Sequence, residues 1–254
     1  MPKATSKSPK EIALIRESCH IVAEVLRLLK GYVRPGVSTK ELDRLAEEFI
    51  RSRDAEPAFL GYGSDRRNLY PASICASVND EVVHGIPGGR TLREGNVISI
   101  DVGVKKEGFY GDGAWTFQVG AVDEENARLM KVAEESLFKG IEQARAGNRV
   151  HDISAAVQQH VEKAGFSVVR DLVGHGVGRN LHEEPAIPNF GKAGTGMLLQ
   201  SGMTLAIEPM VNAGAYDVKI DGDGWTVRTL DGSSSAHFEH TIVITDNGPE
   251  ILTK

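Results

Sequence analysis

Apolar residues recur at helical spacing in two pairs of segments. The first segment opens at Ser8-Pro9-Lys10-Glu11, a capping box with Pro at the first helical position, and ends at Gly31. A second helix begins at Ser38, after the turn at 34–36, and runs through Phe49. The same order returns about 111 positions later, which indicates an internal repeat. This second pair is a long helix from about 123 to 145, a break at Gly147, and a helix over about 153–161.

Segments rich in β-forming residues follow each helical pair. They cover residues 97–104, 109–119, 204–211 and 238–245. No Pro/Ser-rich linker separates the halves, so we expect them to share one core and one sheet. The prediction is a single α+β domain with an approximate two-fold repeat, in which an antiparallel sheet is backed by two helix pairs. Its bounds are 9–254, with halves at about 9–120 and 121–254, after a flexible basic tail at 1–8. A site is expected at the seam between the halves.

Composition narrows the class of protein. Of 254 residues, 41% are hydrophobic and 25% charged, which is typical of soluble globular proteins and excludes disordered, collagen-like and disulfide-rich chains. The chain has no apolar stretch long enough for a membrane span and no signal sequence, so we expect a cytoplasmic protein. The only two cysteines, Cys19 and Cys75, are expected to be buried free thiols. A net charge of −6 argues against a nucleic-acid-binding surface over the whole protein.

The candidate chemistry begins in the hairpin that contains Asp101 and Asp112. If the turn centres between Lys106 and Glu107, the two aspartates lie directly opposite each other, and like charges in that position destabilise a hairpin unless something neutralises them. A divalent cation would do so. The alternative is a turn with an odd number of residues, which would send the two carboxylates to opposite faces; Lys-Glu is not a favoured two-residue turn.

Three further candidates lie in the second half. His175 stands among three glycines, where it is either a metal ligand or an ordinary loop residue. Glu208 interrupts an apolar strand, where an ionised carboxylate is costly unless paired or metal-bound; Pro209, however, is compatible with an edge strand and a solvent-facing glutamate. Glu239 alternates with Phe238 and His240, which also allows exposure to solvent.

Taken together, the four carboxylates and one histidine indicate a metal site. Oxygen-dominated ligand sets suit Mn, Fe, Co or Zn in a dinuclear centre better than a sulfur-rich structural zinc site. Two such ions roughly 3.5–4 Å apart activate a shared water as a nucleophile. The pattern therefore predicts a hydrolase.

Several motifs, in order along nearly the whole chain from about 8 to 252, resemble the signature set of type I methionine aminopeptidases. They are Val78-Asn79-Asp80-Glu81-Val82-Val83-His84-Gly85-Ile86-Pro87, Ile100-Asp101-Val102-Gly103, Gly111-Asp112, Gly174-His175-Gly176-Val177-Gly178, His182-Glu183-Glu184-Pro185, Ile207-Glu208-Pro209-Met210 and Phe238-Glu239-His240-Thr241. Any one of these motifs is weak evidence, whereas the set is specific. The resemblance implies the two-fold "pita-bread" fold and release of the initiator methionine from new polypeptides, preferentially when the second residue is small.

The resemblance also implies a role for each matched residue. Asp101, Asp112, His175, Glu208 and Glu239 would bind two divalent ions, with Asp112 and Glu239 bridging. Glu208 would handle the proton of the attacking water. His84 and His182 would contact the substrate and stabilise the tetrahedral intermediate. The implied partners are nascent polypeptides with N-terminal Met, with the ribosome near its exit tunnel as a further candidate, and the expected state is a monomer without a membrane or sequence-specific nucleic-acid partner.

The methionine pocket is less sharply defined by the sequence. Tyr62, Tyr70, Cys75 and Trp225 are candidates for its lining, because a thioether meets aromatic edges favourably, although plain core packing explains them nearly as well. The segment at 63–69 is longer than in the common pattern, so either tyrosine could border the pocket. Leu181, before His182, stands where many family members have an aromatic residue, which affects the pocket rim and the preference for the second substrate residue.

Two rival functions remain at this stage. Another pita-bread peptidase, such as an aminopeptidase P or a prolidase, would cleave Xaa-Pro peptides; those enzymes usually carry a large extra N-terminal domain, and none precedes Ser8 here. A non-catalytic binding protein on the same fold would typically lack some metal ligands, whereas all five are present.

Overall fold

The computed structural model describes residues 5–254, and its four α-helices confirm the helical pattern. They are α1 (Pro9–Lys30), α2 (Thr39–Ser52), α3 (Glu124–Gln143) and α4 (Val150–Lys163). Ser8 and Glu11 form the expected capping box, and the side chains of Ser38 and Asp123 cap α2 and α3. No helix in the described part of the chain is both long and apolar enough to cross a membrane.

The strands form four antiparallel sheets rather than the single shared sheet that we expected. In the first half, β4 (Val97–Lys106) pairs with β1 (Glu56–Pro57), β2 (Cys75–Val78) and β5 (Phe109–Gln118). A second sheet has the order β15 (Gly248–Ile251), β14 (His240–Thr245), β9 (Thr204–Ile207), β7 (Val173–Gly176) and β8 (Glu183–Pro188). The third is β13 (Ser235–His237), β10 (Met210–Asn212) and β6 (Ser167–Val168), and the fourth is β11 (Val218–Ile220), β12 (Val227–Thr229) and β3 (Glu81–Val83).

Two predicted strands differ from the observed ones, and both differences lie at candidate ligands. The predicted strand over 204–211 divides into β9 and β10 at Glu208-Pro209, and the one over 238–245 begins only at His240, after Glu239. Proline lacks the N–H that a continuing ladder would need, so the sheet cannot pass through Pro209. Glu208 and Glu239 therefore lie in gaps between sheets rather than on a solvent-facing edge.

The register predicted for the β4–β5 hairpin is wrong, because the turn is centred one residue later than predicted. The turn residues are Glu107 and Gly108, both with positive φ, as a two-residue turn of the favoured hairpin type requires. Asp101 consequently pairs with Ala114, and Asp112 pairs with Gly103. Because residues 112 and 114 lie on the same face, the two aspartates are diagonal neighbours on one face instead of direct partners.

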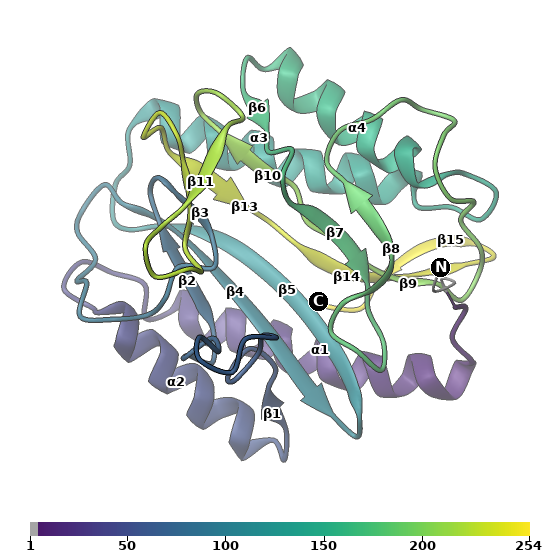
Figure 1. Cartoon of the computed structure of the whole chain (residues 1–254), viewed down its shortest axis with the longest axis horizontal. Helices are drawn as coiled ribbons and strands as arrows, with labels where there is room; N and C mark the ends of the chain where they lie inside the picture. The colour runs from purple at the N-terminus through teal and green to yellow at the C-terminus, as the bar shows by residue number, and fades with distance from the viewer. Residues whose placement is uncertain (1–4) are drawn as a thin grey trace.

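Each half has its own main hydrophobic core, and the two cores meet at the centre of the molecule. One core lies between α1, α2 and the β4–β5 hairpin, and the other lies between α3, α4 and the C-terminal strands. Trp115, on β5, packs against both. In Figure 1, α1 and α2 lie below the strands and α3 and α4 lie above them, as the predicted repeat requires.

Part of the predicted N-terminal tail packs against the domain. Residues 1–4 of that tail lie outside the described residues. Lys7, in contrast, is anchored: its Nζ lies 2.7 Å from Glu183 Oε2, its side chain is 7% exposed, and its N–H donates to the carbonyl of Gly202. This ion pair ties the residues just before α1 to the start of β8.

Candidate metal centre

One cavity of about 250 Å³ contains all five residues predicted to bind metal. Asp101 reaches it from β4, Asp112 from β5 and His175 from β7, while Glu208 and Glu239 reach it from the strand breaks. The first two residues come from the N-terminal half and the other three from the C-terminal half. The site thus lies at the seam between the halves, as the repeat predicted.

The distances define a compact cluster of oxygen and nitrogen atoms. His175 Nε2 lies 3.4 Å from Glu208 Oε1 and 3.8 Å from Asp112 Oδ2. Asp112, His175 and Glu239 each offer one ligand atom, all within 4.8 Å of one another. Ligand atoms about 2 Å from a common ion have separations of this order. Asp101 lines the same cavity but is not one of these three residues.

Burial makes the negative charges of the cluster costly. It raises the pKa of the Asp101 carboxyl to about 7 and holds the pKa values of Asp112, Glu208 and Glu239 well above the ordinary range. Charge repulsion adds to the effect, because Asp112 is close to Glu239, and Glu239 is close to Glu208. Clustered carboxylates of this kind need either protons or a cation.

The donor set fits a divalent cation. Asp101 Oδ1 and Glu239 Oε1 are buried without a hydrogen-bond partner among residues 5–254. No ion pair with a lysine or arginine is found for any of the four carboxylates in the described structure. Buried carboxylate oxygens without partners are rare in folded proteins, and a bound metal is a standard explanation. Hard oxygen ligands with one imidazole suit Mn, Fe, Co or Zn.

The orientation of His175 also suits a metal ligand. Its Nδ1 lies 2.9 Å from the Gly176 carbonyl, to which the Nδ1–H donates, so the lone pair is on Nε2. Burial lowers the pKa of His175 to about 3, which keeps this imidazole neutral at physiological pH. Gly174 allows the close approach of β7 to β9, because a Cβ at that position would lie 2.5 Å from the carbonyl oxygen of Ala206.

The other two predicted histidines, His84 and His182, line the same cavity. The His182 ring lies 4.2 Å from the His175 ring, centre to centre, and its Nδ1 is 2.6 Å from the Tyr62 hydroxyl. Burial lowers the pKa of His84 to about 4 and that of His182 below its ordinary value. His84 has a φ of 59°, a left-handed conformation that non-glycine residues rarely adopt.

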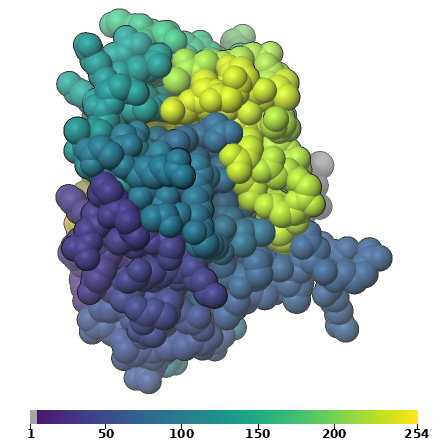
Figure 2. Space-filling model, turned by 90° about the vertical axis from the view of Figure 1, so that its left-hand side faces the viewer, coloured from purple at the N-terminus to yellow at the C-terminus, as the bar shows by residue number. Residues whose placement is uncertain are grey.

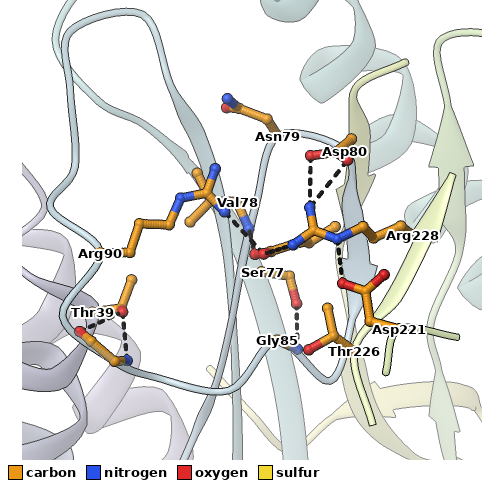
Figure 3. Close-up of polar contacts among 12 residues, drawn as sticks. Thr39, Ser77, Val78, Asn79, Asp80, Gly85, Arg90, Asp221, Thr226 and Arg228 are labelled. Atoms are coloured by element: carbon orange, nitrogen blue, oxygen red, sulfur yellow. Dashed lines mark hydrogen bonds and ion pairs between the residues drawn. The ribbon is translucent and has the colours of Figure 1, made fainter. Parts of the chain in front are cut away.

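An arginine clamp holds the backbone around His84. Arg228, on β12, donates through Nη1 to both Asp80 oxygens at 3.0 Å and through Nη2 to Glu81 Oε1 at 2.6 Å, and its Nε donates to Asp221. Figure 3 shows the guanidinium between Asp80 and Asp221, with Arg90 approaching from the other side. The clamp joins β3, which leads directly into His84, to the β11–β12 hairpin.

The other end of the cavity is apolar and aromatic. Phe59, Tyr70, Cys75 and Leu181 form a buried cluster, against which Trp225 packs. Tyr70 and Trp225 meet edge to face with centroids 5.2 Å apart. Tyr62 is 40% exposed and lies at the cavity rim.

The loop that carries Tyr62 projects from the surface. In Figure 2 the blue segment extends at the lower right, next to the yellow-green β11–β12 hairpin. Two hydrogen bonds join loop and hairpin: the Asn68 side chain donates to the Asp223 carbonyl, and the Trp225 indole donates to the Asn68 carbonyl. The segment 63–69 therefore meets the hairpin through which Trp225 reaches the cavity.

Sequence reasoning missed several residues of the site, among them Phe59, Met210 and His237. Phe59 and Met210 line the cavity, and His237 lies beside Glu208 and Glu239 in a second ligand triad. Met210 directly follows the Glu208-Pro209 break, and His237 is two residues before Glu239, which was the available signal. Phe59 carried no comparable signal.

The comparisons with known proteins agree with this geometry. Residues 13–246 match the model of metallopeptidase family M24. The chain therefore belongs to metallopeptidase family M24. Relatives that match over nearly the whole of both chains include methionine aminopeptidases of several bacteria. The chain is 55% identical to the methionine aminopeptidase of Clostridium perfringens over 97% of each chain and 52% identical to methionine aminopeptidase 1 of Bacillus subtilis over 98% of each.

Solved structures support the fold. The crystal structure of methionine aminopeptidase from Thermotoga maritima is similar to this structure with a TM-score of 0.96 and 47% sequence identity. The match covers 99% of this chain and 100% of the Thermotoga maritima chain. The prolidase from Pyrococcus furiosus matches with a TM-score of 0.79 at 20% identity, and the match covers 66% of that chain. The latter likeness concerns the pita-bread fold alone.

Proposed function

We propose that this chain is a metal-dependent aminopeptidase that removes N-terminal methionine, preferentially when the second residue is small. The observation that carries the proposal is the cavity itself, which joins a carboxylate-rich cluster at one end to an aromatic, sulfur-containing apolar end. Relatives at 45–55% identity over nearly the whole chain are named for this activity. All candidate residues belong to one chain, so a monomer suffices, and nascent chains would reach it in the cytoplasm.

The proposed metal ligands are Asp101, Asp112, His175, Glu208 and Glu239, holding two divalent ions with Asp112 and Glu239 shared between them. When bound, such ions lower the pKa of water and polarise a peptide carbonyl. The diagonal neighbours Asp101 and Asp112 lie on one sheet face, so both carboxylates can serve a single centre. Co, Mn, Fe and Zn all fit this ligand set.

Glu208 is the proposed proton carrier. It stands in the break between β9 and β10, and its side chain is 13% exposed at the cavity wall. Burial and the nearby Asp112 raise its pKa, which favours acceptance of a proton. Glu208 would take the proton from the attacking water and deliver it to the departing amine.

His84 and His182 are the proposed donors to the substrate carbonyl. Their lowered pKa values make them neutral at physiological pH, so each offers an N–H dipole rather than a positive charge. If the Tyr62 hydroxyl donates to His182 Nδ1, the tautomer with hydrogen on Nε2 is selected, and that N–H is free to donate to the substrate.

The methionine side chain would enter the apolar end of the cavity. Tyr70, Cys75, Leu181 and Trp225 would surround it, with Tyr62 at the rim. Aromatic edges near a thioether are favourable, by about 0.3–1.5 kcal/mol for each contact. Tyr70 is the better candidate for the pocket wall because it is buried and packs against Trp225, whereas Tyr62 contacts His182.

A peptide assay across several metals tests the proposal. Protein reconstituted with Co²⁺, Mn²⁺, Fe²⁺ or Zn²⁺ should release Met from Met-Ala-Ser, and a chelator should abolish the release. Xaa-Pro peptides should not be cleaved. Cleavage of Xaa-Pro peptides alone would select a prolidase-like function instead, and absence of turnover with every metal would select a binding protein on this fold.

A further inference from the structure

His237 is a buried titratable residue that the proposed five-ligand centre does not use. It lies at the end of β13 and is 1% exposed. Neither of its ring nitrogens has a hydrogen-bond partner within the described chain. A buried polar group without a partner is unfavourable and calls for an explanation.

The imidazole of His237 points at the carboxylates of the centre. Its Nε2 lies 3.7 Å from Glu208 Oε2 and 3.9 Å from Glu239 Oε2. The other oxygen of Glu208, Oε1, faces His175 Nε2 at 3.4 Å. The two oxygens of Glu208 therefore face two different imidazoles, one on each side.

The two histidines differ in the way their rings are held. His175 uses Nδ1 to donate to a backbone carbonyl, which fixes its ring as a ligand requires. His237 Nδ1 has no such support among residues 5–254, so His237 lacks that feature of a metal ligand. A carboxylate that binds metal through one oxygen normally accepts a hydrogen bond on the other oxygen. No described side chain donates a hydrogen bond of ordinary length to Glu208. The ring nitrogen that lies beside Glu208 Oε2 is Nε2 of His237.

We propose that His237 is a positioning residue that donates a hydrogen bond from Nε2–H to Glu208 Oε2. Movement of the Glu208 carboxylate by less than about 1 Å would bring this contact to an ordinary length of about 2.9 Å. The bond would hold Oε1 toward His175 and would fix the angle from which Glu208 takes and delivers a proton. The inference rests on the role proposed for Glu208 above.

Two substitutions separate hydrogen-bond donation from packing. His237→Gln keeps an N–H donor near the same position, whereas His237→Leu fills similar space without a donor. We expect the Leu variant to bind Co²⁺ about 10–100-fold more weakly in isothermal titration calorimetry, and its kcat to fall by a similar factor with little change in KM. The Gln variant should stay within a few-fold of the wild-type protein in both measurements.

Thermal unfolding of the metal-free proteins distinguishes a positioning role from a structural one. If His237 were needed for stability, His237→Leu would lower the Tm. Because both nitrogens of His237 lack partners, their replacement by Leu should leave the Tm unchanged or raise it. The matched control is His240→Leu. His240 is partly buried, its Nδ1 is hydrogen-bonded to the Thr253 hydroxyl, and its ring packs on Trp115, so Co²⁺ affinity should not change.

Three outcomes would overturn the inference. Wild-type Co²⁺ affinity in His237→Leu would remove His237 from the site, and equal loss in the Gln and Leu variants would show that a donor is not what matters. Loss of one imidazole from the X-ray absorption signal of Co²⁺-loaded His237→Gln would make His237 a direct ligand. Calorimetry reports these results even if wild-type protein fails to cleave Met-Ala-Ser, so failure of the proposed function remains distinguishable.

Discussion

The negative charge of Asp112 is especially unfavourable in the metal-free centre. Its carboxylate is buried close to Glu239 and Asp101, and it accepts a hydrogen bond from the N–H of Gly113 at 3.1 Å. In the proposed centre it is one of the two shared ligands. A substitution that keeps shape and the Gly113 hydrogen bond but removes charge therefore tests Asp112 directly.

Asp112→Asn should lower turnover of Met-Ala-Ser at least about 100-fold, because a neutral amide is a poor bridging ligand. The metal-free variant should stay folded, with a Tm equal to or above that of the wild-type protein, since a buried charge is gone. Steady-state kinetics and thermal unfolding measure the two effects. Asp246→Asn, at an exposed turn, is the control. Wild-type turnover in Asp112→Asn would exclude Asp112 from the centre.

Protons must leave the centre when metal binds. With a pKa of about 7, Asp101 is partly protonated at neutral pH in the metal-free protein, and burial also raises the pKa values of Asp112, Glu208 and Glu239 well above their ordinary range. His175, with a pKa of about 3, is already neutral and releases none. Metal affinity should therefore rise as the pH increases from about 6 to 8.

Calorimetric titrations in two buffers of different ionisation enthalpy measure this proton release. The apparent binding enthalpy should differ between the buffers, and the difference should shrink as the pH is raised above the pKa values of the carboxyls. Identical enthalpies in both buffers at pH 6 would contradict the raised pKa values.

Local signals predicted the helices well and the strand pairing less well. The caps at Ser8, Ser38 and Asp123 depend on residues three positions apart, so they can be read from the sequence. The register of the β4–β5 hairpin depends instead on which residues accept positive φ. Glu107 does so beside Gly108, so the true turn is centred one residue later than the predicted Lys106-Glu107 turn, and every cross-strand partner differs from the prediction by two residues.

In the candidate site, too, local sequence patterns indicated some residues, whereas others are recognised only in the three-dimensional structure. The acids and His175 could be nominated because polar residues in apolar strands are unusual, and the family resemblance supplied their grouping. His237 could not be nominated, because its significance lies in the absence of a partner for its ring, which only the three-dimensional surroundings reveal. The Arg228 clamp joins residues 147 or 148 positions apart, beyond the reach of any local pattern.

The clamp makes β3 and the β11–β12 hairpin one unit. Arg228→Met would leave Asp80 and Asp221 without a cation and Glu81 with Arg90 alone, and we expect a loss of about 1–3 kcal/mol in the free energy of unfolding. KM for Met-Ala-Ser should rise several-fold, because Trp225 and His84 lose their common support. Arg228→Lys should recover only part of the effect, since one ammonium cannot reproduce the guanidinium fork.

Kinetics and urea unfolding of the two variants test the clamp. Arg67→Met is a suitable control, because the Arg67 side chain is 91% exposed and pairs only with Asp65, two residues earlier, among the described residues. An unchanged KM in Arg228→Met, together with lower stability, would restrict the clamp to a purely structural role.

Trp115 joins the two halves. It stands on β5 in the N-terminal half, meets Phe238 of the C-terminal half edge to face at 4.9 Å, and packs on both cores. Since no linker separates the halves and the ligands come from both, we expect metal-free protein to unfold as one cooperative unit.

Trp115→Ala should lower the free energy of unfolding by about 2–4 kcal/mol, somewhat less than for a fully buried tryptophan because Trp115 is partly exposed. Circular dichroism and fluorescence should give coincident urea transitions in the wild-type protein. Two separated wild-type transitions would mean that each half folds on its own core.

The two free thiols stand in unlike surroundings, and the difference has a practical consequence. Cys75 lines the cavity. Cys19 lies where α1 packs on β5, so closely that a Cβ on Gly111 would be 2.5 Å from the backbone nitrogen of Cys19. Burial raises the pKa of both thiols, which lowers the thiolate fraction of each and slows its alkylation in the native state. A small alkylating reagent would thus reach Cys75 through the substrate entrance, but would reach Cys19 only when α1 separates from β5. The alkylation rate of Cys75 would therefore report whether a ligand occupies the cavity, and that of Cys19 would report global opening of the protein.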